Sequence, residues 1–242
     1  MILNTGLLTH FYGDKIPMHT YFLCLLAVLL AAYFLGSINS AILFSRTVYH
    51  EDIRTKGSGN AGMTNMLRTY GKGAAVLTLV GDMGKTVIAI LLSGLIFGFN
   101  YMSGVAIGGQ LGECYLVGLF AVLGHIYPVY YKFKGGKGVL VTSTMALMLS
   151  PVAFLILLLL FVGIVAVSKY VSLGSIVIAS LYPVVMHGYF AFMLGSIMLI
   201  FAALSTIILA ILIVYCHRAN IVRIGNRTEN KISFRKKNTD GQ

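Results

Sequence analysis

The chain has 242 residues, of which 58% are apolar and only 10% carry a charge. An ordinary soluble domain carries charge on roughly 25% of its residues, so the composition predicts a polytopic membrane protein. It excludes a disordered chain, a coiled coil and a disulfide-rich secreted scaffold. The charge is one-sided, because 18 Lys and Arg stand against 7 Asp and Glu. Such an excess sets membrane orientation, and it also attracts phosphate esters and lipid headgroups.

Cysteine and histidine give no sign of a metal or cofactor site. Cys24, Cys114 and Cys216 lie singly in apolar segments, with no CxxC pair, so no disulfide framework is expected. The six histidines show neither HExxH nor a Cys/His ligand spacing. The first apolar run, from about Tyr21 to Phe44, is too long for the core of a signal peptide.

The apolar runs predict an all-α fold with about seven transmembrane helices, some of them short. In chain order we expect them near residues 21–44, 74–97, 113–131, 138–149, 152–167, 171–188 and 195–216. Residues 1–217 would form a single integral-membrane catalytic domain, followed by a basic cytoplasmic tail at 218–242.

Orientation and helix number follow from the basic residues. They cluster after the first helix, after the third helix and in the tail, so these segments are expected in the cytoplasm and the N-terminus outside. An even number of crossings must then connect Lys137 with the tail. We therefore expect the chain to turn at Ser150–Pro151, since proline disfavours helix continuation. The resulting helix at 138–149 is short and needs protein or water around it.

The loop after the first helix reads GSGNAGMTNMLR from Gly57 to Arg68. Its glycines allow close backbone approach, and Ser58 or Asn60 is a good N-cap. A helix starting there would align Asn60, Thr64 and Arg68 on one polar stripe. Free N–H groups at a helix N-terminus bind anions, and arginine is a bidentate phosphate partner. The alternative is an amphipathic helix lying on the membrane surface.

Two motifs in this region are misleading. Gly57-x-Gly59-x-x-Gly62 has the dinucleotide-binding spacing but follows no predicted strand. Gly84-Lys85-Thr86 resembles the end of a P-loop, but Leu79 stands where its first glycine is required. Asp82 and Lys85 are instead spaced i, i+3 within an expected membrane helix. Such a pair either neutralises itself or supports the nearby site.

The second basic loop reads KGGKG from Lys134 to Gly138, directly before the short helix. Gly135 and Gly136 would expose backbone donors at the positive end of that helix, with Lys137 as a point charge. The alternative is a flexible, positively charged turn. At the end of the last helix, His217, Asn220 and Arg223 share one face. His217 would be a general base or a charge that complements the helix dipole. His125 is expected to be a packed interfacial residue.

Together these segments resemble the PlsY family, the membrane-integral acyl-phosphate:glycerol-3-phosphate acyltransferases of bacteria. The resemblance covers almost the whole chain from about Gly36. It is carried by GSGNAGMTNMLR at 57–68, GKGAAVLTLVGDMGK at 71–85, GHIYPVYYKFKGGKGV at 124–139 and HRANI at 217–221. The chain departs from the family pattern at Asn39, Met63, Thr86 and Arg227.

The resemblance implies transfer of a fatty acyl group from acyl phosphate to the 1-hydroxyl of glycerol 3-phosphate. The products would be lysophosphatidate and phosphate, in the first step of bacterial phospholipid synthesis. The enzyme would span the bacterial cytoplasmic (inner) membrane several times, with its active site facing the cytoplasm. The chain has no HxxxxD sequence, the dyad of acyl-CoA-type acyltransferases. The proton acceptor would be His217 or, as we favour, the departing phosphate, because acyl phosphate is an activated mixed anhydride and phosphate titrates near neutrality.

The implied site residues fall into three groups. Catalytic roles are expected for Ser58, Arg68, Lys137, His217 and Asn220. Phosphate binding is expected for Gly57, Gly59, Asn60, Thr64, Gly135 and Gly136, and supporting roles for Asp82 and Lys85. No metal and no cofactor are expected. The expected partners are acyl phosphate, glycerol 3-phosphate and membrane lipids, and not nucleic acid. Contact with an acyl-phosphate synthase or an acyl-carrier protein is left open.

Two other functions fit parts of the pattern. A transporter for a phosphorylated metabolite would place polar residues near mid-membrane in repeated halves. Here the polar residues lie at the helix ends, and we find no internal repeat. A non-catalytic scaffold would leave both glycine loops unexplained.

Overall fold

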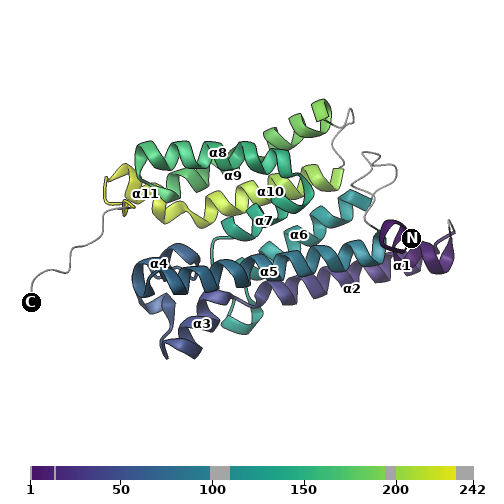
Figure 1. Cartoon of the computed structure of the whole chain (residues 1–242), viewed down its shortest axis with the longest axis horizontal. Helices are drawn as coiled ribbons and strands as arrows, with labels where there is room; N and C mark the ends of the chain where they lie inside the picture. The colour runs from purple at the N-terminus through teal and green to yellow at the C-terminus, as the bar shows by residue number, and fades with distance from the viewer. Residues whose placement is uncertain (1, 14, 99–109, 194–199, 233–242) are drawn as a thin grey trace, which may run out of the picture.

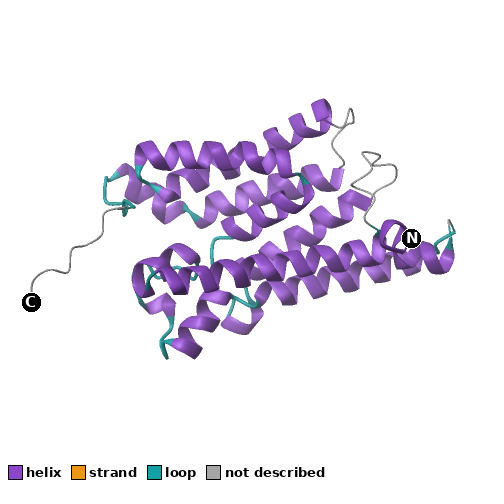
Figure 2. Cartoon of the chain, in the orientation of Figure 1, coloured by secondary structure: helices purple, strands orange, loops and turns teal. Residues whose placement is uncertain are grey.

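The computed structural model describes residues 2–13, 15–98, 110–193 and 200–232. All regular structure in these ranges is helical (Figure 2). The α-helices are α1 (Ile2–Tyr12), α2 (Met18–Ser37), α3 (Ser40–Val48), α4 (Met63–Tyr70), α5 (Lys72–Phe97), α6 (Gln110–Ile126), α7 (Val139–Leu149), α8 (Pro151–Ser168), α9 (Val171–Gly188), α10 (Ile200–Cys216) and α11 (Arg218–Gly225). Short 3₁₀ turns, η1 (Ile53–Thr55) and η3 (Val129–Tyr131), and a π-helical turn, η4 (Tyr189–Met193), complete the fold.

The helices form two groups with α7 between them (Figure 1). α2, α5 and α6 pack along one another on one side, and on the other side α9 packs against both α8 and α10, while α10 also packs against α6. α7 contacts α5, α6 and α8, so it joins the two groups. Val141 and Met145 of α7 are fully buried, as expected for a short helix surrounded by protein.

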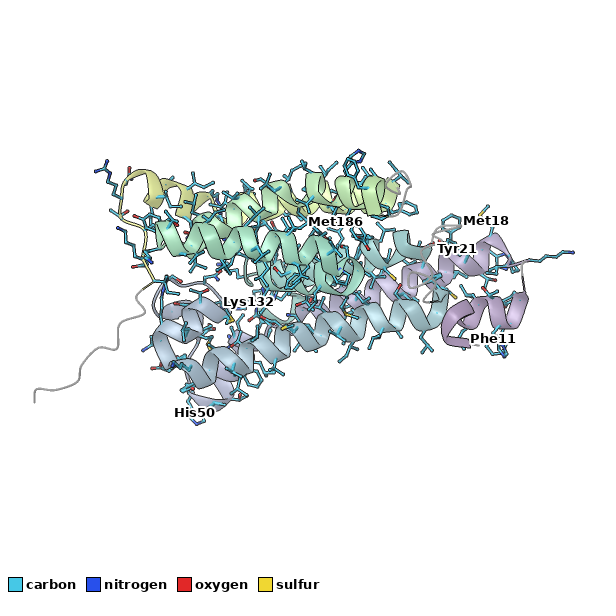
Figure 3. All side chains as sticks on the ribbon, turned by 45° about the horizontal axis from the view of Figure 1, so that its top comes forward. Phe11, Met18, Tyr21, His50, Lys132 and Met186 are labelled. Carbon is cyan, nitrogen blue, oxygen red and sulfur yellow. The ribbon has the colours of Figure 1, made fainter. Side chains whose placement is uncertain are left out.

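The two ends of the bundle differ in charge. α3, α4, α11 and Lys132 lie at one end, whereas α1 and Met18 lie at the other (Figures 1 and 3). We call the first the basic end. Its elements and loops carry Arg46, Arg54, Lys56, Arg68, Lys72, Lys132, Lys134, Lys137, Lys169, Arg218, Arg223, Arg227 and Lys231. Lys15 lies between α1 and α2, at the opposite end.

Five helices have the length and composition of membrane spans: Met18–Ser37, Lys72–Phe97, Gly112–Tyr131, Pro151–Ser168 and Val171–Phe192. α10 and α11 form a sixth candidate that is bent by 54°, and α7 is a shorter apolar helix. The multi-span helical fold is therefore confirmed, and the turn at Ser150–Pro151 is present. The first residues of the expected helix at 195–216 lie outside the described residues. Residues 233–242 of the expected tail also lie outside them.

The first expected helix, 21–44, differs from the structure because the chain breaks between α2 and α3. Gly36 allows α2 to approach α6 closely, since a Cβ there would lie 2.2 Å from the carbonyl oxygen of Ala121. The backbone then turns at Ile38, and the Asn39 side chain accepts a hydrogen bond of 3.0 Å from the amide of Ile42. Asn39 thus caps α3. The predicted helix ran across this break, although residues 36–40 read GSINS and contain one apolar side chain, Ile38.

α1 was not expected from the sequence. It is only 11 residues long, and Gly6 within it has a φ of 77°. A Cβ on Gly6 would lie 2.5 Å from the backbone of Phe97, so glycine allows α1 to pack against the end of α5.

Candidate active site

A cavity of about 620 Å³ begins at the basic end and extends between the two helix groups. The polar residues that line its basic end include Ser58, Asn60, Thr64, Arg68, Lys137, His217, Asn220, Arg223 and Glu229, and Asp82, His125, Thr142, Ser143, Thr144 and Ser175 are among the other polar lining residues. Its apolar lining, which we call the apolar arm, comprises Leu79, Met83, Val139, Leu140, Ala146, Leu147, Phe154, Leu157, Leu158, Phe161, Ile178, Ala179 and Tyr182. The apolar arm is built by α5, α7, α8 and α9. One continuous cavity therefore offers cationic groups at one end and a hydrocarbon-like wall beyond them.

The segment of residues 57–62, which we call the glycine loop, contributes Ser58, Gly59, Asn60 and Gly62 to the polar end, and α4 follows it. Asn65, buried in the first turns of α4, organises this loop. Its Nδ2 donates to the carbonyl oxygens of residues 53, 56 and 60 at 3.2, 3.0 and 3.0 Å, and its Oδ1 accepts from the amide of Ser58 at 2.9 Å. Asn65 is not among the predicted site residues, although it lies within the GSGNAGMTNMLR motif at 57–68.

The glycine loop differs from the expected cradle in two respects. α4 begins at Met63 with Gly62 as its N-cap, so Asn60 precedes the helix and only Thr64 and Arg68 share its polar stripe. The amides of Ser58 and Gly59 donate to Asn65 and to the carbonyl of Lys56, so neither is available to an anion here. Available backbone donors lie instead in the first turn of α4, whose first amides have no acceptor within the helix.

Gly57 has a φ of 56°, and a Cβ on it would lie 2.3 Å from Oδ1 of Asn65. Glycine is thus required by the packing of the Asn65 amide against the loop. Gly57 does not line the cavity, whereas Gly59 does. The structure places Gly57 behind the site and not against a ligand.

The loop before α7 packs tightly against the end of α6. The amides of Gly135 and Gly136 donate to the carbonyls of Ile126 and His125, both at 3.1 Å. A Cβ on Gly136 would lie 2.2 Å from Nε2 of His125 and 2.7 Å from the carbonyl oxygen of Ala61. These contacts contradict the expectation that Gly135 and Gly136 bind phosphate through their amides. The two glycines instead hold the loop close to α6 and thereby position Lys137.

Lys137 reaches across the cavity to α11. Its Nζ donates a hydrogen bond to Oδ1 of Asn220, and Nδ2 of Asn220 donates to Oε1 of Glu229 at 2.8 Å. Glu229 also accepts from Ser172 at 2.9 Å and forms an ion pair of 2.7 Å with Nε of Arg223. Glu229 therefore ties together α9, α11 and the segment that follows α11. Glu229 is not among the residues predicted from the sequence, because nothing in its local pattern indicates that it folds back onto Asn220.

Arg68 lies on α4, on the other side of this opening. Its guanidinium donates to the carbonyl oxygen of Asn230 at 3.4 Å, which joins α4 to the segment after α11. Arg68 also lines the cavity. The polar end therefore contains cations from three separate elements, namely Arg68, Lys137 and Arg223.

The electrostatics of this end favour an anionic ligand. Burial, together with the nearby charge of Arg223, lowers the pKa of Lys137 to about 8. Burial opposes the ionisation of Glu229, but hydrogen bonds from Arg223, Asn220 and Ser172 outweigh it and lower the pKa of that carboxyl. A phosphate beside Lys137 would supply the counter-charge that this ammonium lacks.

His217 stands at the bend between α10 and α11 and is buried. Its Nδ1 lies 2.7 Å from the carbonyl oxygen of Ile213. A carbonyl oxygen can only accept, so Nδ1 carries the hydrogen and the neutral ring has an acceptor at Nε2. The ring is thereby fixed in the tautomer that a proton acceptor requires.

Asp82, Lys85 and His125 form a buried polar group between α2, α5 and α6. Lys85 forms an ion pair of 2.9 Å with Asp82 and donates to the carbonyls of Gly36 and Ile38 at 3.0 and 2.8 Å. His125 is 4% exposed, in agreement with a packed residue, and its Nδ1 lies 3.0 Å from Nζ of Lys85. Asp82 and His125 line the cavity but Lys85 does not. The group supports the helix break and the KGGKG loop beside the site.

The structure thus brings most of the expected residues to one cavity, from segments far apart in the sequence. Ser58, Gly59, Asn60, Thr64, Arg68, Asp82, Lys137, His217 and Asn220 line it, whereas Gly57, Gly135, Gly136 and Lys85 lie behind its wall. Within the described ranges, no three His, Cys, Asp or Glu side chains gather in the way that metal ligands do.

Comparisons with known proteins agree with this arrangement. Residues 26–227 match the family model described as glycerol-3-phosphate acyltransferase. The chain is 41% identical over 210 residues to the glycerol-3-phosphate acyltransferase of Syntrophomonas wolfei, covering 86% of this chain and 96% of that protein. It is 42% identical over 207 residues to the protein of the same name from Geobacillus kaustophilus, covering 86% and 95%.

Solved structures give the same result. The crystal structure of PlsY (YgiH), an integral membrane glycerol 3-phosphate acyltransferase in its glycerol 3-phosphate form, aligns with a TM-score of 0.73. The sequences are 32% identical, and the alignment covers 86% of this chain and 96% of that one. Its lysophosphatidic acid form aligns with a TM-score of 0.70.

Proposed function

Since this chain belongs to the glycerol-3-phosphate acyltransferase family, and is a membrane enzyme that acylates glycerol 3-phosphate, we propose that its acyl donor is acyl phosphate. The cavity at the basic end would be the place of transfer. The products are then lysophosphatidate and inorganic phosphate. Family membership sets aside a transporter and a non-catalytic scaffold.

The observation that carries this proposal is the continuity of the cavity. Its polar end presents Arg68, Lys137 and Arg223, which suit phosphate groups, and its apolar arm runs on between α7, α8 and α9. Acyl phosphate has this same order of parts, a phosphate joined directly to a fatty chain. A site for a large, polar thioester carrier would need further polar surface beyond the cations.

Each group at the polar end has a proposed role. The first-turn amides of α4, with the side chains of Ser58, Asn60 and Thr64, support the binding of one phosphate. Arg68 and Lys137 would neutralise the second phosphate and the charge that develops on the leaving group. His217 and Asn220 would orient glycerol 3-phosphate so that its 1-hydroxyl points at the acyl carbon. We place Gly57, Gly135 and Gly136 in supporting roles, together with Asp82 and Lys85.

The reaction needs no group that the chain lacks. The hydroxyl oxygen of glycerol 3-phosphate bonds to the acyl carbon, and the bond between that carbon and the phosphate oxygen breaks. The hydroxyl proton passes to the departing phosphate, whose basicity lies near neutrality, so substrate assistance is sufficient. Nε2 of His217 is the competing acceptor, because its Nδ1 is engaged by Ile213. An activated mixed anhydride requires positioning more than strong base catalysis.

Membrane placement completes the proposal. Orientation is set by Lys and Arg near the ends of the spans, so the basic end would face the cytoplasm of a bacterial cell. The N-terminal end, with Lys15, would then lie outside the cytoplasmic membrane. Acyl phosphate would enter from the lipid and glycerol 3-phosphate from the cytoplasm.

A phosphate-release assay in detergent tests the donor. Purified enzyme is given acyl phosphate, acyl-CoA or acylated carrier protein, each with and without glycerol 3-phosphate. We expect phosphate and lysophosphatidate in equal amounts, from acyl phosphate and only when both substrates are present. Equal or faster acylation from a thioester donor would overturn the proposed donor while leaving the family activity intact.

Orientation has a separate test. In a cysteine-free background, Lys15→Cys and Lys132→Cys are exposed to a membrane-impermeant maleimide in intact cells. We expect labelling at position 15 only, and at both positions after permeabilisation. Labelling of Lys132→Cys in intact cells would place the basic end outside.

A further inference from the structure

Two buried side-chain hydroxyl groups in the described part of the cavity wall have no hydrogen-bond partner. Among the described residues, the buried side-chain atoms without a partner belong to Glu113, Thr142, Tyr182 and Ser205. Thr142 and Tyr182 line the cavity, and the other two do not. The Thr142 side chain belongs to a residue that is only 7% exposed, so ordinary solvation does not satisfy it.

The free hydroxyl of Thr142 is unusual within this protein. A threonine in an apolar helix ordinarily donates to the carbonyl four residues earlier. Thr78, Thr86 and Thr144 do so, at 2.8, 2.8 and 2.9 Å. Thr144 lies on the same helix as Thr142, so the difference does not come from the surroundings of α7 as a whole. A buried donor left unused in this way suits a ligand that supplies the acceptor.

The depth of Thr142 within the cavity indicates which atom of the ligand its hydroxyl would contact. α7 starts directly after Lys137, and Thr142 lies four residues beyond Gly138, about 6 Å along the helix axis at 1.5 Å per residue. Tyr182 lies eleven residues beyond Val171 on α9, about 16 Å deep, within the apolar arm. In acyl phosphate the carbonyl is joined to the phosphate by a single oxygen, and only hydrocarbon follows. With the phosphate held near Lys137, the carbonyl oxygen is the polar atom at the depth of Thr142.

We propose that the hydroxyl of Thr142 donates a hydrogen bond to the carbonyl oxygen of the acyl group and stabilises the negative charge that this oxygen gains when glycerol 3-phosphate attacks. The attacking oxygen forms its bond to the acyl carbon, and the carbonyl electrons move onto the oxygen beside Thr142. They return when the bond to phosphate breaks, and the proton leaves with the phosphate. The inference rests on the proposed acyl-phosphate donor, and it makes Thr142 a catalytic residue that the sequence motifs do not include.

Such a donor has a defined kinetic signature. A donor aimed at charge that develops in the transition state affects kcat more than KM, and loss of one oxyanion donor costs roughly 100-fold in kcat. Thr142→Val keeps the shape of the side chain and removes only the hydroxyl. We expect kcat with acyl phosphate to fall about 100-fold, with KM for glycerol 3-phosphate unchanged. Thr142→Ser should retain most of the wild-type kcat.

Stability separates this role from a structural one. The hydroxyl has no partner in the free enzyme, so its removal should leave the melting temperature in detergent unchanged or raise it. Thr144→Val is the matched control on the same helix, because its hydroxyl is already engaged by Leu140. We expect Thr144→Val to keep wild-type kcat.

The outcomes are distinguishable. Wild-type kcat in Thr142→Val, or an equal loss in Thr144→Val, would overturn the proposal. If Thr142→Val does not fold, Thr142→Ala is compared with Thr142→Ser by the same criteria. If the wild-type enzyme releases no phosphate from acyl phosphate, it is the proposed donor that fails, and this result is seen before any variant is made.

Discussion

The ammonium of Lys137 donates a hydrogen bond to the side-chain oxygen of Asn220, a residue 83 positions later in the chain. This bond closes the polar end of the cavity between the loop before α7 and the start of α11. Asn220 in turn donates to Glu229, so the position of the lysine depends on the segment that follows α11. A ligand phosphate can replace the amide oxygen as the acceptor for Lys137 without moving the backbone.

Removal of the two central cations should abolish most of the activity. In Arg68→Ala and in Lys137→Ala, the loss of a cationic phosphate partner should lower kcat/KM by roughly 100-fold in the phosphate-release assay. Lys132→Ala is the matched control, because Lys132 is an exposed cation in the same loop and does not line the cavity. Equal losses in all three variants would indicate a general effect of charge and contradict the pocket.

Activity should decline in mild alkali because Lys137 loses its charge. The pKa of Lys137 is lowered to about 8 in the free enzyme, so kcat/KM should fall as the pH rises through about 8. Bound phosphate favours the ammonium, and kcat at saturating substrate should therefore decline only at higher pH. Lys137→Arg, which keeps its charge in this range, should lose the alkaline limb. If kcat/KM of Lys137→Arg still declined above about pH 8 as in the wild type, the decline would belong to another titrating group.

Gly136 should not tolerate a methyl group. In Gly136→Ala the added Cβ would meet Nε2 of His125 at 2.2 Å and the carbonyl of Ala61 at 2.7 Å. Both neighbours are held in packed structure, so we expect a loss of about 2 kcal/mol or more in the free energy of unfolding. Gly84→Ala, where a Cβ meets nothing within 4 Å, should be neutral or slightly stabilising. Thermal melting in detergent provides the comparison.

Asn65 should be essential to the glycine loop. Asn65→Asp keeps the size of the side chain but replaces the Nδ2 donor with an acceptor that faces three carbonyl oxygens. We expect the free energy of unfolding to fall by about 3 kcal/mol and the KM values for acyl phosphate and glycerol 3-phosphate to rise. Asn226→Asp, at an exposed position, controls for the added charge. A variant that melts and turns over like the wild type would contradict the organising role of Asn65.

Tyr182 should limit the length of the acyl chain. It is the lining residue of α9 farthest from the basic end, so Tyr182→Ala should extend the apolar arm and favour longer acyl phosphates. Tyr182→Phe should retain the wild-type preference and should not lower the melting temperature, since its hydroxyl has no partner. Competition between acyl phosphates of different length measures the preference. Leu159→Ala, at a lipid-facing position of α8 that is 73% exposed, serves as the control.

Much of the architecture could be predicted because lipid imposes simple requirements on sequence. Apolar runs gave the helices, and Pro151 gave the turn before α8. Motif residues such as Arg68 and His217 could be found because their residue types are unusual between apolar segments. These signals are local, so they survive without knowledge of the fold.

The remainder depends on contacts between distant segments. The break between α2 and α3 is stabilised by Lys85 from another helix, and apolar residues alone do not show it. Glu229 acquires its role only when the chain folds back onto Asn220 and Ser172. Gly135 and Gly136 belong to a glycine- and lysine-rich loop that is typical of anion binding, but their amides donate to carbonyl oxygens at the end of α6.

The ion pair between Asp82 and Lys85 has a consequence for how this protein can change. Lys85 donates to the carbonyl oxygens of Gly36, in the last turn of α2, and of Ile38, just after it, and Asp82 accepts from the amide of Ser40 at the start of α3 at 3.4 Å. Loss of either charge alone would leave the other uncompensated among apolar helices, at a cost of about 3–5 kcal/mol. A neutral pair would also leave the helix break without its donors and acceptor. Substitution at either position alone is therefore expected to be costly, and loss of both charges together would require another way to satisfy the backbone between α2 and α3.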